Sequence, residues 1–104
     1  MQRGEVWWAN LPEPVGHRPV VLVTRNQGIQ VREVVSVVEV TTRIRHISAE
    51  VSLGMEDGLP KVCVANCDVI TTIPKTQLDK RITALSAVKL QLLDDALRYS
   101  LGLD

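Results

Sequence analysis

Along most of the chain, hydrophobic and polar residues alternate in short runs, a pattern that predicts β-strands. The strands are expected at residues 5–11, 19–24, 33–40, 47–53, 62–67, 69–73 and 81–85. The run at 33–40 is apolar on both faces in its middle, which is typical of a central strand. Asn26-Gln27-Gly28 indicates a turn, and Pro74 is expected to end the strand before it.

The period changes to a helical one near the end of the chain, over residues 86–101. Four leucines fall on one face there: Leu90, Leu93, Leu97 and Leu101. Ser86 suits the N-cap because its hydroxyl can accept a free backbone N–H, and Gly102 suits the left-handed position after the last turn. Many short strands and one terminal helix predict a mainly β protein, a small closed or partly closed barrel with a helix packed on it.

Length and charge limit the classes of protein to consider. The 104 residues fit a single domain, 1–104, with 45% hydrophobic residues. Twelve basic residues balance twelve acidic ones, which argues against a protein that coats long nucleic acid by charge alone but allows a local basic cleft. No apolar signal segment or membrane-spanning run is seen, so we expect a cytoplasmic protein with no membrane partner.

The cysteines do not suggest a metal site or a disulfide framework. Cys63 and Cys67 lie four residues apart in a strand-like run, so both side chains should point to one face. With His17 and His46 they form no finger-like spacing, and a structural zinc ion needs about four ligands. We therefore expect packed, reduced thiols, with no metal and no cofactor.

Three segments carry a resemblance to a known family, in an order and spacing that runs through much of the chain. They are Arg3-Gly4-Glu5-Val6-Trp7, Gly16-His17-Arg18-Pro19-Val20-Val21-Leu22-Val23 and Val38-Glu39-Val40-Thr41-Thr42. Together they are similar to the MazF/PemK toxins. The resemblance implies an SH3-like barrel of the CcdB/PemK type, a homodimer, an endoribonuclease activity and a cognate antitoxin that blocks the site. Asn10, Val69 and Thr71 depart from the residues common in the family, which bears on the sequence that is cut.

RNA can be cut without a metal ion because it carries its own nucleophile, the 2′-OH. Attack on the adjacent phosphorus yields a 2′,3′-cyclic phosphate or 3′-phosphate and a 5′-OH. The enzyme has to hold an in-line geometry, stabilise the additional negative charge and move two protons. A-form duplex holds the 2′-OH out of line, so single-stranded RNA is the expected substrate.

Four residues are the candidates for this chemistry. Arg18 offers a planar fork of donors that matches phosphate oxygens, although an exposed residue at a strand start is the alternative interpretation. Thr42, just past the central strand, falls on the family position and can place its hydroxyl on phosphate, whereas Thr41 would face the other way and be structural. His17 and Glu13, in the loop before Arg18, are a proton shuttle and a base, or polar loop residues without a role.

A second set of residues is expected to bind the RNA chain. Cationic side chains guide a phosphate backbone, and an exposed indole stacks on a base. The candidates are Arg43, Arg45, His46, Lys75, Arg81 and Trp8. A solvated loop is the alternative for each cation, and a partly buried tryptophan is the alternative for Trp8.

Two other functions fit a barrel of this size. A gyrase-binding toxin of the CcdB type needs no phosphate site of Arg18 and Thr42, so those residues argue against it. A non-enzymatic SH3-like binding module usually has an aromatic-rich groove, and this chain has only Trp7, Trp8 and Tyr99. Cleavage of single-stranded RNA in the presence of EDTA would exclude both.

Overall fold

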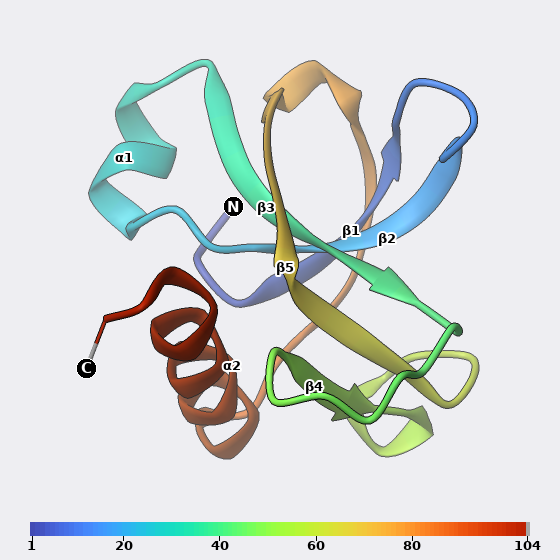
Figure 1. Cartoon of the computed structure of the whole chain (residues 1–104). Helices are drawn as coiled ribbons and strands as arrows, with labels where there is room; N and C mark the ends of the chain where they lie inside the picture. The colour runs from blue at the N-terminus through green and yellow to red at the C-terminus, as the bar shows by residue number, and fades with distance from the viewer. Residues whose placement is uncertain (104) are drawn as a thin grey trace.

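A strongly curled antiparallel sheet forms most of the protein, and a C-terminal helix packs against one end of it in the computed structural model, which describes residues 1–103 (Figure 1). The strands are β1 (Glu5–Asn10), β2 (His17–Leu22), β3 (Val34–Thr41), β4 (Glu50–Leu53), β5 (Cys63–Pro74) and β6 (Leu78–Ala84). The helices are α1 (Asn26–Val31) and α2 (Ala87–Leu101), with short 3-10 turns η1 (Met55–Asp57) and η2 (Lys75–Gln77). The six strands lie in the order β4-β5-β3-β2-β1-β6, and every neighbouring pair is antiparallel. The predicted mainly β, partly closed barrel with a terminal helix is confirmed.

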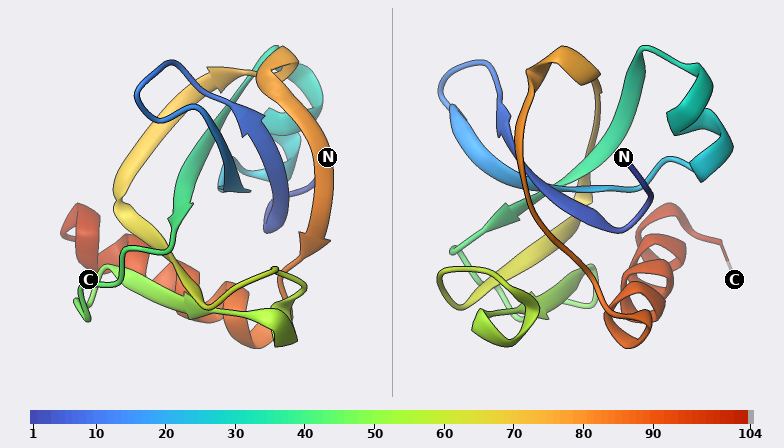
Figure 2. Two further views of the ribbon diagram at one scale, coloured as in Figure 1. Left: turned by 90° about the vertical axis from the view of Figure 1, so that its right-hand side faces the viewer. Right: turned by 180° about the vertical axis from the view of Figure 1, so that it is seen from behind.

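The central strand β3 contributes to two hydrophobic cores because both of its faces are apolar. Val38 and Val40 belong to the core that α2 covers through Leu93. Val35 and Val37 belong to a second core on the opposite face, which the curled sheet encloses (Figure 2). The prediction that 33–40 is a central strand is therefore confirmed.

Helix α2 begins and ends as the sequence predicts. The Ser86 hydroxyl accepts a hydrogen bond from the backbone N–H of Lys89 at 3.2 Å, and Gly102 takes a left-handed φ of 71° just after the last turn. Leu93 is fully buried, and Leu90 and Leu97 pack partly against the same core. Leu101 is instead 57% exposed, so the predicted leucine face is buried over its first three members only. No helix within residues 1–103 is long and apolar enough to cross a membrane.

The structure corrects four of the expected elements. The expected strand 47–53 is confined to β4, Glu50–Leu53, because residues 48–49 form a turn before it. Residues 26–28 open helix α1 rather than a simple turn, because burial of Gly28 and Ile29 favours a helix there. The expected strands 62–67 and 69–73 are one strand, β5, whose pairing with β3 shifts between Val38 and Glu39. This shift absorbs Asp68, the one residue between the two runs, as an irregularity of the ladder. Strand β6 begins at Leu78, earlier than the predicted 81.

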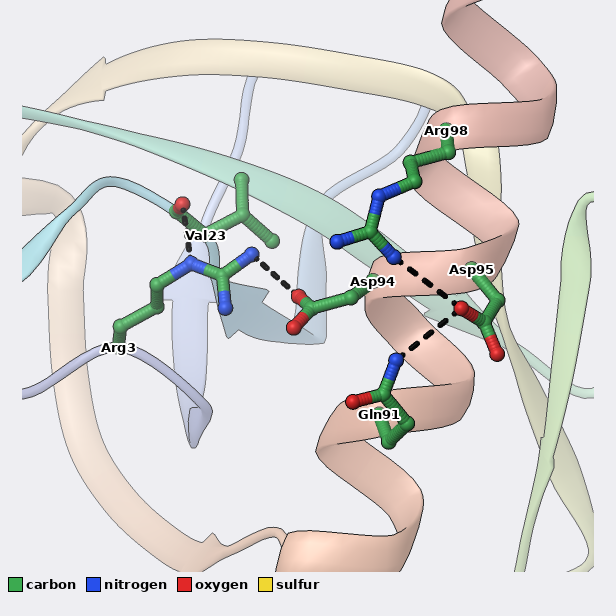
Figure 3. A network of polar contacts seen from close by, with 6 residues as sticks. All are labelled: Arg3, Val23, Gln91, Asp94, Asp95 and Arg98. Atoms are coloured by element: carbon green, nitrogen blue, oxygen red, sulfur yellow. Dashed lines mark hydrogen bonds and ion pairs between the residues drawn. The ribbon is translucent and has the colours of Figure 1, made fainter. Parts of the chain in front are cut away.

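The N-terminal segment is tied to α2 by a charged side chain. Nη2 of Arg3 lies 2.7 Å from Oδ1 of Asp94, and Nε of Arg3 donates to the carbonyl of Val23 at 2.9 Å (Figure 3). Gly4 follows with a φ of 90°, and a Cβ there would lie 3.2 Å from Cδ1 of Leu90. The Arg3-Gly4 pair thus closes one end of the sheet against the helix.

Candidate active site

Arg18 projects from β2 toward an acidic residue of β3. Val20 is the direct partner of Glu39 across the ladder, and Arg18 lies on the same face as Val20, two residues earlier. Nη1 of Arg18 lies 3.3 Å from Oε1 of Glu39, and the two side chains are 33% and 15% exposed. Both residues sit on paired strands, so the ladder brings the two side chains to the same face of the sheet.

A hollow of about 460 Å³ opens beside this ion pair, and we call it the basic hollow. It is lined by Arg18, Glu39, Thr41, Thr42, Arg43, Arg45, Asn66 and Val69. Three arginines against one carboxylate give it a positive charge, and anions are attracted to such a concave site. Its arginines offer the donors that phosphate oxygens accept.

The loop after β3 carries two of these arginines, and a carboxylate of β4 holds it in place. Glu50 accepts hydrogen bonds from the backbone N–H of Arg45 at 3.1 and 3.2 Å and from that of His46 at 3.0 Å. His46 is exposed and adopts a left-handed φ of 57°. The loop is thus ordered by an acid that does not line the hollow.

The two threonines at the end of β3 differ in how their hydroxyls are used. Oγ1 of Thr41 accepts a hydrogen bond from the backbone N–H of Arg43 at 3.1 Å. The Thr42 side chain is exposed and makes no hydrogen bond with any part of the chain that the structure describes. The Thr42 hydroxyl is therefore the one available to a ligand, although both residues line the basic hollow.

A second, smaller hollow of about 140 Å³ shares both threonines with the first, and we call it the apolar hollow. It is lined by Trp8, Pro19, Val40, Thr41, Thr42, Leu59, Pro60, Lys61 and Cys63. Trp8 is the cross-strand partner of Pro19, so it lies on the opposite face of the sheet from Arg18. The end of β3 separates the two hollows.

Glu13 lies in the β1–β2 loop, whereas His17, which the sequence placed in that loop, is the first residue of β2, and neither lines the basic hollow. The His17 ring stacks on the Trp8 indole, with centroids 4.7 Å apart and an angle of 12° between the planes. Nε2 of His17 lies 3.4 Å from Oδ2 of Asp79 on β6. Glu13 is exposed.

Lys75 and Arg81 are not brought to either hollow. Nζ of Lys75 donates to the carbonyl of Ile29 in α1. Nε of Arg81 lies 3.5 Å from Oε2 of Glu5 at the start of β1. Of the residues predicted from the sequence, the structure gathers Arg18 and Thr42 with two basic residues of the following loop, Arg43 and Arg45.

Glu39 and Asn66 line the basic hollow and were missed by the sequence analysis. Glu39 carried a usable signal, because it is the only charged residue within the strand 34–41. Charged residues are seldom placed in central strands without a partner. Asn66 carried no such signal, because only the shifted register of β5 places it opposite Glu39.

Three side chains near the core have shifted pKa values. Burial, with the nearby charges of Asp57 and Glu56, raises the pKa of the Cys63 thiol. Burial, with the charge of Asp68, raises the pKa of Cys67 to about 11, so both thiols are neutral at physiological pH. No group of three or more potential metal ligands occurs within residues 1–103.

For Glu5, burial opposes ionisation, yet other contacts outweigh it and the pKa of this carboxyl is lowered. The indole of Trp7 and the backbone of Gln2 form hydrogen bonds with it, and the charges of the N-terminus and Arg81 favour its ionised form. Arg81 thus forms its ion pair with the start of β1, and on β6 it is the cross-strand partner of Trp7, next to Lys80, which pairs with Trp8.

The protein thus combines a curled antiparallel sheet and a terminal helix with a basic hollow at the end of β3. A family model described as the PemK-like, MazF-like toxin of type II toxin–antitoxin systems matches residues 2–101. The chain belongs to this family. The resemblance inferred from the three sequence segments is confirmed.

Individual relatives cover nearly the whole chain. It is 39% identical over 103 residues to a protein of Mycobacterium tuberculosis named probable endoribonuclease MazF2, covering 98% of this chain and 99% of that one. The solved structure of the Mycobacterium tuberculosis toxin MazF-mt6 matches with a TM-score of 0.88 at 30% identity, covering 96% and 98% of the two chains. A mycobacterial endoribonuclease solved in complex with its cognate antitoxin matches with a TM-score of 0.89 at 28% identity, covering 100% and 97%. The predicted membership of an endoribonuclease family is confirmed.

Proposed function

We propose that this chain is a toxin that cuts single-stranded RNA at a short sequence, without a metal ion, at the basic hollow. One observation carries the proposal: Arg18, fixed on β2 by its contact with Glu39, shares a hollow with the free hydroxyl of Thr42 and the arginines that follow it. The family membership and the endoribonuclease names of the relatives point the same way.

In the proposed reaction the scissile phosphate lies against Arg18 and Thr42. The 2′-OH of the preceding ribose attacks the phosphorus, and the bond to the 5′-oxygen breaks. Arg18 donates hydrogen bonds to the phosphate oxygens, whose negative charge increases in the transition state, and Thr42 donates one more. The products are a 2′,3′-cyclic phosphate, or the 3′-phosphate after hydrolysis, and a 5′-OH.

His17 at the start of β2 and Glu13 in the β1–β2 loop remain the proposed proton-transfer groups. An imidazole can both take and give a proton, and Nε2 of His17 lies 3.4 Å from Oδ2 of Asp79. Glu13 is an exposed carboxylate in the same loop. Neither residue lines the basic hollow, so either can act only if the bound RNA chain reaches it.

The proposed RNA path follows the loop after β3. Arg43 and Arg45 line the basic hollow and His46 follows them, so these cations can hold neighbouring phosphates. Trp8 is the proposed stacking residue. Lys75 and Arg81 are left out of this path, because their contacts with Ile29 and Glu5 place them elsewhere.

We also propose a homodimer, a cognate antitoxin and a cytoplasmic location. Val34 and Ile70 are each 38% exposed on β3 and β5, where a second copy can bury them. An acidic antitoxin tail would complement Arg43 and Arg45 and would order on binding. A toxin with an RNA substrate and an antitoxin encoded beside it acts where both are present, in the cytoplasm.

The decisive experiment is to incubate the purified chain with long single-stranded RNA in excess EDTA and to determine the chemistry of the new ends. We expect cuts at a recurring short sequence, with 5′-OH and 2′,3′-cyclic or 3′-phosphate ends. Complete loss of activity in the chelator, or 5′-phosphate ends, would contradict the proposed reaction. Absence of cutting under all conditions would favour the gyrase-binding or the non-enzymatic alternative.

A further inference from the structure

The lining of the apolar hollow is unsuited to binding the phosphate groups of an RNA chain. It adjoins the basic hollow through Thr41 and Thr42, and its other walls are Trp8, Pro19 and the segment 59–61. Its lining is mostly apolar, whereas phosphates require hydrogen-bond donors and charge. With a volume of about 140 Å³ it is smaller than the roughly 300–1,000 Å³ of pockets for drug-sized ligands, so it suits a single small ring system.

The indole of Trp8 is oriented by its stacking contact with the His17 ring. His17 covers part of it at a centroid distance of 4.7 Å, and His17 is itself 3.4 Å from the carboxylate of Asp79. Trp8 lines the apolar hollow but His17 does not, so the hollow borders a part of the indole that His17 leaves uncovered. A flat ligand entering the hollow would meet an aromatic surface whose orientation is already fixed.

The opposite wall is also preformed. Leu59 and Cys63 are only 3% and 5% exposed, and both belong to the core beneath α2. Gly58, just before this wall, has a φ of 92°, and a Cβ there would lie 2.7 Å from Oγ1 of Thr83 on β6. The segment is therefore seated closely against the sheet. Lys61, at the rim, is exposed and forms no ion pair with residues 1–103.

We propose that the apolar hollow receives one unstacked base of the RNA, that of a nucleotide adjoining the phosphate held by Arg18 and Thr42. This inference rests on the proposed function, because it takes the basic hollow as the place of the scissile phosphate. The flat face of a base matches the indole, and the apolar walls exclude water around it. Lys61 can donate to a carbonyl oxygen of the base at the rim. In this arrangement Trp8 binds the base by stacking, which any base allows, and Lys61 is the specificity-determining residue.

The first test measures binding and does not depend on cleavage. Trp7→Phe leaves Trp8 as the only tryptophan, and Trp7 lines neither hollow. In this background Arg18→Ala prevents cutting, and a short single-stranded RNA of mixed sequence is added. We expect the Trp8 emission to be quenched by the RNA and not by an oligonucleotide of the same length whose bases are all removed. Unchanged Trp8 emission, while fluorescence anisotropy of a labelled RNA shows binding, would overturn the proposal.

The second test combines a protein change with a substrate change. With intact RNA, Trp8→Ala should lower kcat/KM by about 5- to 150-fold, the range that base–aromatic stacking typically contributes. Two further RNAs each lack one of the two bases that flank the cleaved bond. With one of these two RNAs Trp8→Ala should cause no further loss, and Trp8→Phe should keep most of the activity on intact RNA. Equal losses on all three RNAs would mean that Trp8 acts only through the fold. A loss of affinity for the antitoxin without any effect on RNA would assign the hollow to the protein partner.

The two tests separate this proposal from the one on which it rests. If the wild-type chain cuts no RNA, the proposed function fails, while the quenching measurement still reports whether a base enters the hollow. If cutting proceeds normally and neither Trp8 emission nor the abasic substrate responds, the cleavage proposal stands and the base pocket is refuted.

Discussion

Replacing Arg18 by alanine should separate catalysis from folding in this protein. The guanidinium meets Glu39 through one contact of 3.3 Å, and a third of the Arg18 side chain is exposed, so the pair itself contributes at most about 1 kcal/mol to stability. Leaving the Glu39 carboxylate, which is 15% exposed, without its cation adds a desolvation cost of order 1 kcal/mol. The free energy of unfolding should therefore fall by about 1–2 kcal/mol, which leaves most small domains folded.

The rate of RNA cleavage should fall far more. Loss of one preorganised donor to a developing negative charge typically costs about 10²–10³ in kcat. Single-turnover cleavage of a defined single-stranded RNA measures this loss, and denaturant unfolding measures the stability. Arg3→Ala is the matched control, because it removes an arginine paired with Asp94 at 2.7 Å outside both hollows. The reasoning is refuted if Arg18→Ala cuts within tenfold of the wild type, or if Arg3→Ala loses as much activity at equal stability.

Three further predictions use the same assays. Thr42→Ala should slow cleavage less than Arg18→Ala does but more than Thr41→Ala, because the Thr41 hydroxyl is already bonded within the loop; equal rates for the two threonine variants would contradict this. Changing Arg43 and Arg45 together to glutamate should weaken both RNA cleavage and the binding of an acidic antitoxin tail. The loss of tail affinity should be smaller at high salt, because salt screens the interaction between exposed charges. An unchanged affinity for the tail would show that the antitoxin binds at another surface. Burial raises the pKa of Cys67 to about 11 in the folded chain. Above the ordinary thiol pKa the unfolded chain therefore loses a proton that the folded chain keeps, so the free energy of unfolding falls as pH rises toward 11. Cys67→Ala should remove that part of the pH dependence of the unfolding free energy, and an unchanged slope would show that another group causes it.

Local patterns in the sequence were sufficient to predict most of the fold. Alternation predicted the strands because each side of the curled sheet faces a core or solvent in turn. The cap residues Ser86 and Gly102 predicted the ends of α2 because each satisfies backbone groups within one turn of itself. These signals are short-range, so a single sequence contains them in full.

What the sequence did not predict depends on contacts between distant residues. Helix α1 forms where the composition indicates a turn, because Ile29 reaches the core beside β3. The unbroken β5 requires the shift that places Asn66 opposite Glu39, and no local pattern encodes a register. The apolar hollow likewise joins Trp8 of β1 to the segment 59–61, which lies about half the chain away.

The structure also explains how a chain without net charge can keep a basic site. The acids near the basic hollow are used for positioning: Glu39 orients Arg18, and Glu50 holds the loop that carries Arg43 and Arg45 through its backbone N–H groups, leaving their guanidinium groups unpaired with it. Carboxylates farther away pair with other cations, as Asp94 does with Arg3. Opposite charges are thus balanced over the whole molecule but separated locally. An anionic ligand responds to the charges within a Debye length of about 8–10 Å, so it is attracted by the local excess of arginines.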